Sequence, residues 1–109
     1  MPAVHDDGFE QLLDELQGDP RVARGMMFGH RAGKLGRKVF CIDFDGDVVV
    51  KLGAERVQEL VAAGTAAVFD PMGGRPMTGW ARVPPAAGDP VAAWLALAEE
   101  AKEVVSEGG

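Results

Sequence analysis

Three aspartates near the middle of the chain are the first residues whose type and spacing could support chemistry. Asp43, Asp45 and Asp47 alternate through one short segment, as acids do in calcium-binding loops. An EF-hand loop also needs glycine at its sixth position and glutamate at its twelfth, where this chain has Val48 and Ala54. We therefore interpret the acids as turn formers and predict no metal site and no cofactor.

The supply of nucleophiles and proton carriers is small. The chain has no Tyr or Asn, and its candidates are Cys41, Ser106, His5 and His30. Cys41 lies in the middle of a predicted strand, where a buried apolar role is the more common one. A nucleophile with a base and an orienting group cannot be assembled from this set, so we predict that the protein is not an enzyme. A small-molecule enzyme or binder remains an alternative that requires an enclosed pocket around His30 or Asp43.

Basic residues gather in one segment of an otherwise acidic chain. The net charge is −6, yet residues 20–42 contain no Asp or Glu and carry six Lys and Arg residues. The candidate nucleic-acid-binding residues in this segment are Arg31, Lys34, Arg37 and Lys38. They could contact phosphates from a loop at residues 31–38, or they could belong to a solvated loop that balances acidic helices. This spacing would scatter the charges over both faces of an extended loop, which disfavours binding to nucleic acid.

The spacing of apolar residues predicts an α+β fold with two layers, in which helices cover one face of an antiparallel five-stranded sheet. Helical spacing marks residues 9–16, 54–63 and 90–105. Strand patterns mark residues 22–28, 66–69 and 78–83, with two more strands in residues 37–53. The polar residues 30–38 are interpreted as a loop or a strand edge. The predicted order is α-β-β-β-α-β-β-α, in one domain spanning residues 1–109 with flexible ends at 1–5 and 106–109.

The hairpin in residues 37–53 sets the register of the predicted sheet. A three-residue loop at Asp45, Gly46 and Asp47 gives one clean apolar face, whereas a two-residue loop does not. The face predicted to meet the helices consists of Phe40, Ile42, Phe44, Val48, Val50 and Leu52. The opposite face is then half apolar and consists of Val39, Cys41, Asp43, Val49 and Lys51.

The strand at residues 78–83 adds to both faces. Gly79 and Ala81 are small enough for a helix to approach, while Trp80 and Arg82 point the other way, and Trp94 is expected in the core. Because an exposed apolar face usually marks an interface, we expect a homodimer that buries the back of the sheet. The candidate interface residues are Val39, Cys41, Val49, Trp80 and Arg82.

Targeting signals do not stand out in the sequence. The first ten residues are acidic and lack an apolar core, and the apolar runs are shorter than a membrane span. These features lead us to expect a cytoplasmic protein with no membrane partner.

Several motifs, in this order and spacing, resemble the N-terminal domain of the TfoX (Sxy) competence regulators. The likeness covers nearly the whole chain and is strongest at Phe69-x-Pro71-Met72-Gly73-Gly74-Arg75-Pro76-Met77, followed by Trp80 and Pro84. The other motifs are Met27-Phe28-Gly29, Gly36-x-Lys38-Val39-Phe40, Val50-Lys51-Leu52 and Ala62-Ala63-Gly64.

The resemblance implies a helix-on-sheet domain that is commonly dimeric and takes part in transcriptional regulation. Well-known members of that family promote DNA-uptake genes alongside the cyclic-AMP receptor protein. We therefore expect a non-enzymatic regulatory module that works through protein contacts, as a homodimer and with a transcription factor as a further partner. Direct nucleic-acid binding through residues 31–38 is the first alternative, and a small-molecule enzyme or binder is the second.

Overall fold

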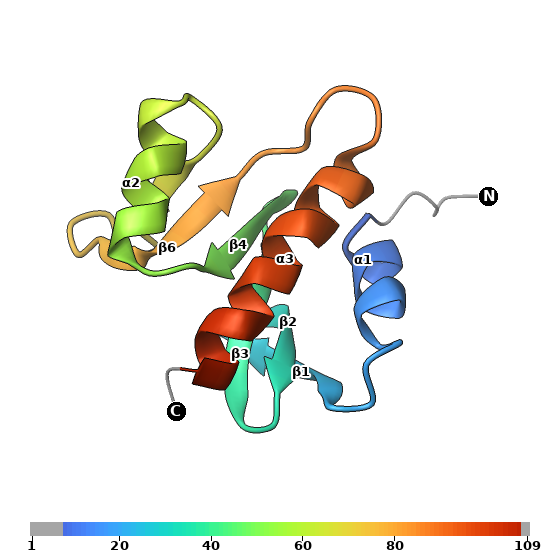
Figure 1. Ribbon diagram of the computed structural model, residues 1–109. Helices are drawn as coiled ribbons and strands as arrows, with labels where there is room; N and C mark the ends of the chain where they lie inside the picture. The colour runs from blue at the N-terminus through green and yellow to red at the C-terminus, as the bar shows by residue number, and fades with distance from the viewer. Residues whose placement is uncertain (1–7, 108–109) are drawn as a thin grey trace.

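A computed structural model describes residues 8–107 as an α+β fold, in which helices pack on an antiparallel six-stranded sheet (Figure 1). The elements in chain order are α1 (Gly8–Leu16), β1 (Val22–Met27), β2 (His30–Leu35), β3 (Lys38–Phe44), β4 (Asp47–Lys51), α2 (Ala54–Ala62), β5 (Ala67–Phe69), β6 (Met77–Val83) and α3 (Pro90–Glu107). The strand order in the sheet is β1-β2-β3-β4-β6-β5. The α+β class is confirmed, and the predicted five-stranded sheet gains a strand.

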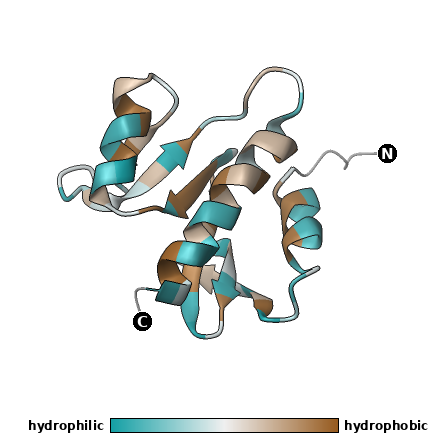
Figure 2. Cartoon of the chain, in the orientation of Figure 1, coloured by the Kyte–Doolittle hydropathy of each residue, from teal (hydrophilic) through white to brown (hydrophobic). Residues whose placement is uncertain are grey.

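The three predicted helices form because each has an apolar stripe and a suitable end. In α1 the buried side chains recur at helical spacing, from Phe9 to Leu16. Asp89 caps the N-terminus of α3, since its carboxylate accepts a hydrogen bond from the backbone N–H of Ala92 at 3.1 Å. Gly64 follows α2 with a φ of 77°, the left-handed conformation that the sequence predicts there. Figure 2 shows brown and teal segments on all three helices, in keeping with these two-sided patterns.

The ends of the chain lie partly outside the described residues. The predicted flexible residues 1–5, His5 among them, and residues 108–109 are not described. Ser106 and Glu107, also expected to be flexible, are the last residues of α3. None of the helices in residues 8–107 is long and apolar enough to cross a membrane.

The additional strand is β2, in the polar segment interpreted as a loop or a strand edge. It pairs with β1 and with β3, so residues 31–35 belong to the interior of the sheet. Ala32 and Gly33 are its buried residues. A side chain on Gly33 would meet Cys41 Sγ, because a Cβ built there lies 2.8 Å from it. The buried positions of this strand are therefore small residues, and the usual β-branched pattern is missing from the sequence.

The predicted register of the β3–β4 hairpin is wrong. Phe44 lies opposite Asp47, so the loop has two residues, Asp45 and Gly46, whose φ values are 51° and 89°. Both values are those of a two-residue hairpin turn that matches the twist of the strands. Ile42 consequently lies opposite Val49, on the face away from the helices.

A bulge in the pairing of β2 with β3 explains why strict alternation fails. Gly33 lies opposite Cys41 and Lys34 opposite Val39, so Phe40 is the extra residue. Phe40 and Cys41 consequently both enter the core beneath the helices. The prediction that Cys41 faces away from the helices is therefore wrong.

The main core lies between the helices and the sheet. The predicted faces of β6 are confirmed, since Ala81 packs in this core while Trp80 lies on the opposite side of the sheet. Trp94 is buried as expected, and its indole Nε1–H donates a hydrogen bond to the carbonyl of Val83 at 3.1 Å.

A second, smaller core lies on the far face of the sheet because the sheet curls. Its fully enclosed members include Ile42, Val49 and Phe69. The ring centroids of Phe28, in the β1–β2 turn, and Phe69, in β5, are 6.2 Å apart. In a flat sheet β2 and β5 would be separated by four strand spacings, or about 19 Å. The curl therefore brings the two ends of the sheet together over this face.

Candidate functional site

The four predicted nucleic-acid-binding residues do not form one surface. Arg31 lies beside α1, where its guanidinium is 2.8 Å from Glu10 Oε2 and 2.5 Å from Asp43 Oδ2. The guanidinium also stacks 5.5 Å from the centre of the Phe9 ring. Two carboxylates from different elements thus already neutralise this arginine.

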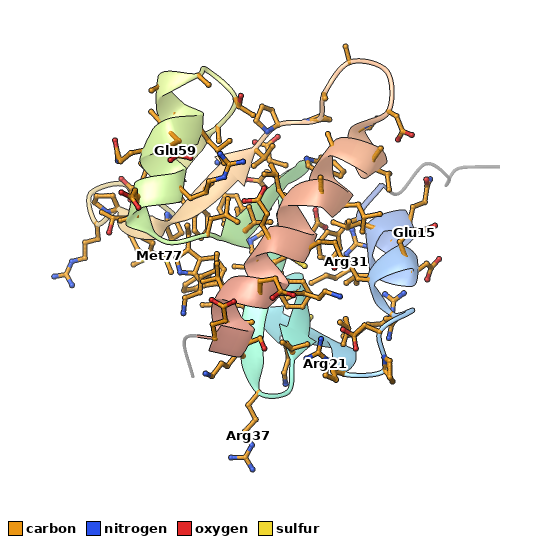
Figure 3. The ribbon with its side chains drawn as sticks, viewed as in Figure 1. Glu15, Arg21, Arg31, Arg37, Glu59 and Met77 are labelled. Carbon is orange, nitrogen blue, oxygen red and sulfur yellow. The ribbon has the colours of Figure 1, made fainter. Side chains whose placement is uncertain are left out.

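The other three cations are divided, because Lys34 lies apart from Arg37 and Lys38. The stem of Lys34 fills the space where a side chain of Gly25 would be, on the face away from the helices. Arg37 is exposed at the β2–β3 turn, and Figure 3 shows its side chain extending clear of the ribbon. Lys38 begins β3 and is half-buried. The expected scattering of these charges is confirmed, although the segment is a strand pair and not a loop.

Arg37 and Lys38 do share one shallow hollow with a third cation, Arg21. The hollow has a volume of about 470 Å³ and an apolar wall formed by Leu35 and Val105. Arg21 forms an ion pair with Asp19, because the Asp19 carboxylate lies 2.8 Å from Arg21 Nη2. The hollow therefore presents fewer free positive charges than its lining suggests.

The predicted interface residues are divided between the two faces of the sheet. Cys41 lies beneath the helices, where burial raises the pKa of its thiol to about 12. Val49 and Trp80 are on the far face but are buried by their own chain. Val39 and Arg82 remain partly exposed on that face.

Arg82 belongs to a polar cluster at the end of the β3–β4 hairpin. Its Nε is 2.6 Å from Asp47 Oδ2, and its guanidinium lies 4.9 Å from the centre of the Phe44 ring. His30 stacks against the same ring, with 4.7 Å between centroids. Asp43 points to the other face, toward Arg31, so the structure does not bring His30 and Asp43 together. Within residues 8–107 no group of three His, Cys, Asp or Glu residues could hold a metal ion.

The turn at residues 70–76, part of the strongest motif of the resemblance, is held by one carboxylate. Asp70 accepts hydrogen bonds from the backbone N–H groups of Gly74, at 3.0 Å, and Arg75, at 3.2 Å. These bonds hold the pKa of Asp70 below its usual value. The turn joins β5 to β6 and leaves Met72 75% exposed.

The β1–β2 hairpin carries exposed apolar side chains that were not among the predicted interface residues. Met26 is 64% exposed and Phe28 is 50% exposed. Exposed apolar side chains of this size are typical of contact sites. The signal in the sequence is a phenylalanine in the first position of a two-residue turn, where Asn or Asp is usual.

The backbone at Phe28 is itself unusual. Met27 lies opposite His30, so Phe28 and Gly29 form the turn, with φ values of 55° and 77°. A bulky residue disfavours a positive φ, and such outliers concentrate at functional positions. The ring is partly held by Phe69, and the rest of it faces outward.

A groove runs along the helix side of β1, next to Met26. It has a volume of about 380 Å³ and lies between α1 and the first two strands. Its lining consists of Leu13, Arg24, Gly25, Met26, Arg31 and Ala32.

The β1–β2 hairpin, with Met26, Phe28 and the adjoining groove, is therefore the candidate functional site. Its exposed groups include apolar side chains and backbone, beside two arginines that are paired with acids of the same chain, and such a surface suits contact with another polypeptide. Comparison with protein families, with curated proteins and with solved structures found no match to this chain.

Proposed function

We propose that this chain is a non-enzymatic regulatory module of the TfoX N-terminal type, which forms a homodimer and acts on transcription through contact with a transcription factor. The observation that carries the proposal is the exposure of Met26 and Phe28 on one hairpin. Exposed apolar side chains of this size, on a surface otherwise rich in charge, favour a protein partner.

The charges of the chain support a protein partner over a nucleic acid. Arg24 in β1 is paired to Glu10 at 2.5 Å and to Asp14 at 3.2 Å, and Arg31 is paired to Glu10 and Asp43. Phosphate binding depends on cations that are free to replace counterions. Much of the basic segment is instead engaged with acids of the same chain.

The motifs of the resemblance have consistent structural roles, which also supports the proposal. Phe69 is fully buried in the second core. Gly73 and Gly74 have φ values of 70° and 155°, which other residues rarely adopt. These motif residues thus specify a folded scaffold, while the neighbouring hairpin offers the contact surface.

The test measures association of the purified chain with itself and with the cyclic-AMP receptor-type activator of the same organism. Light scattering reports the dimer, and biolayer interferometry reports the activator. We expect Phe28→Asn to weaken at least one of the two associations at least tenfold, because asparagine suits the turn but lacks the ring. The proposal is wrong if the wild-type chain stays monomeric and binds no activator at about 100 µM, a weak affinity by the standards of specific complexes.

A further inference from the structure

The outer edge of β1 is an unprotected sheet edge. Among the described strands, β1 pairs with β2 and has no neighbour on its other side (Figure 1). Its pairing with β2 is continuous, and it contains no proline. Natural edge strands usually carry a bulge, a proline or a free charge that prevents further pairing.

The one charge on this strand does not protect the edge. The guanidinium of Arg24 reaches over α1, where it contacts Glu10, Asp14 and the side-chain oxygen of Gln17. Its charge is therefore neutralised within the chain. The edge is left with the backbone of β1 and the exposed thioether of Met26.

Hydrogen-bond geometry identifies which backbone groups face outward. The N–H of Gly36 donates to the carbonyl of Arg21 at 3.4 Å, so the backbone carbonyl of Arg21 points toward β2. Strand residues alternate in direction, so Ala23 and Gly25 also bond to β2, while Arg24 and Met26 direct their N–H and C=O groups away from it. The N–H of Val22 is already donated to the carbonyl of Asp19 at 3.0 Å.

We propose that the homodimer forms when β1 of a second copy pairs antiparallel with this β1, across a twofold axis at Gly25. This inference rests on the dimer of the proposed function and assigns its surface. Arg24 of each copy then lies opposite Met26 of the other, so the two residues with outward backbone groups bond to each other. The result is one sheet that is continuous through both copies.

Self-complementarity selects this register. An axis at Arg24 would place Met26 opposite Val22, whose N–H is already donated to the carbonyl of Asp19, so that register forms fewer hydrogen bonds. Centring the pair on Met26 shortens the overlap of the two strands. At Gly25 the axis passes through a pair without mutual hydrogen bonds, where the Cα atoms approach to about 4.5 Å and the absence of side chains relieves crowding.

The groove beside β1 fits the side chains that this pairing brings together. Met26 projects on the helix side of the sheet, as does Arg24. Met26 of the second copy therefore lies over the groove, against Leu13 and the stem of Arg24. Met26, one of the two exposed apolar residues of the hairpin, then loses contact with water.

A cysteine crosslink tests the axis directly. Gly25→Cys places one thiol of each copy at the axis, and Cys41 does not compete because it is buried. The new side chain would displace the flexible stem of Lys34. We expect mild oxidation to give a disulfide-linked dimer of Gly25→Cys, and to give none with Met72→Cys, the matched control on the exposed turn at residues 70–76.

A charge at the edge gives the second test. We expect Met26→Lys to raise the dimer dissociation constant at least tenfold in sedimentation experiments, while Met72→Lys leaves it unchanged, because both methionines are exposed and only Met26 lies on β1. If the wild-type chain dimerises but Gly25→Cys does not crosslink and Met26→Lys has no effect, this surface is wrong and the dimer stands. A monomeric wild-type chain overturns both the proposed dimer and the surface assigned to it.

Discussion

Phe28 illustrates how one residue can be poorly suited to its own turn and well suited to its surroundings. Its φ of 55° is costly for a side chain of this size, by about 1–2 kcal/mol relative to a right-handed conformation. The contact of its ring with Phe69 offsets part of that cost. The exposed half of the ring contributes nothing to the fold of one chain, which is why we assign it a role in association.

Two substitutions at Phe28 separate the backbone from the ring. Phe28→Asn and Phe28→Ala both remove the contact with Phe69, and asparagine tolerates a positive φ whereas alanine does not. We expect Phe28→Ala to be less stable than Phe28→Asn by about 1 kcal/mol in urea unfolding at one protein concentration. Equal stabilities would show that the turn carries no strain.

The connection between α1 and β1 is held to α3 by a cluster of ion pairs. Lys102 is buried on α3, with its Nζ 3.2 Å from Asp19 Oδ2 and 2.9 Å from Glu99 Oε1. Asp19 also accepts hydrogen bonds from the side chain and the backbone N–H of Arg21. Burial lowers the pKa of Lys102, but its bonds to Glu99 and Asp19 outweigh burial and leave that pKa raised.

Asp19 makes this connection sensitive to acid. Its hydrogen bonds from Arg21, and then Lys102, hold the pKa of the folded-state carboxyl well below its usual range. A lowered pKa stabilises the fold above the unfolded-state value near 4, and that contribution is lost as the pH falls below it. We expect the unfolding free energy of the wild type to fall more steeply between about pH 4 and pH 2 than that of Asp19→Asn.

The measurement is urea unfolding at several pH values, with Glu15→Gln on α1 as the control. The control should keep the wild-type slope, because the side chain of Glu15 forms no hydrogen bond or ion pair within residues 8–107. Parallel curves for the wild type and Asp19→Asn would contradict the role of this carboxylate.

The helices and most strands could be predicted because their patterns are local. Stripes such as the one from Phe9 to Leu16 report burial directly. The strand β2 could not, because its buried residues, Ala32 and Gly33, look the same in a loop. The register of β3 with β4 failed at the bulge around Phe40, which the pairing with β2 creates and no local pattern in β3 reveals.

The candidate site was harder to predict than the fold. Val49 and Trp80 looked available for an interface, but the curl of the sheet buries them. Met26 and Phe28 were predicted as part of a strand at residues 22–28, and the structure leaves both side chains exposed. Exposure of an apolar residue depends on which elements pack around it, so the sequence alone could suggest that an interface exists but not where it lies.

At the scale of the whole molecule, acidic and basic side chains from different elements form ion pairs. The chain has a net charge of −6, and its basic segment at residues 20–42 packs against acids of α1 and of the β3–β4 hairpin. Arg56 of α2 likewise pairs with Glu100 of α3 at 2.9 Å. Intramolecular pairing of this kind leaves an acidic surface with few free cations, which repels a polyanion.

This arrangement predicts that the isolated chain does not bind duplex DNA. We expect no measurable affinity for a labelled duplex at 50 mM salt with about 10 µM protein, conditions under which non-specific binders are usually detected. Arg37 and Lys38 are the cations best placed to bind DNA phosphates, since Arg31 is paired with Glu10 and Asp43. Binding that falls steeply with salt, disappears in the Arg37→Glu, Lys38→Glu double variant and persists in Arg31→Gln would show that the β2–β3 turn contacts phosphates. Absence of binding in the wild type and in both variants would leave the β1–β2 hairpin as the surface through which this protein meets its partners.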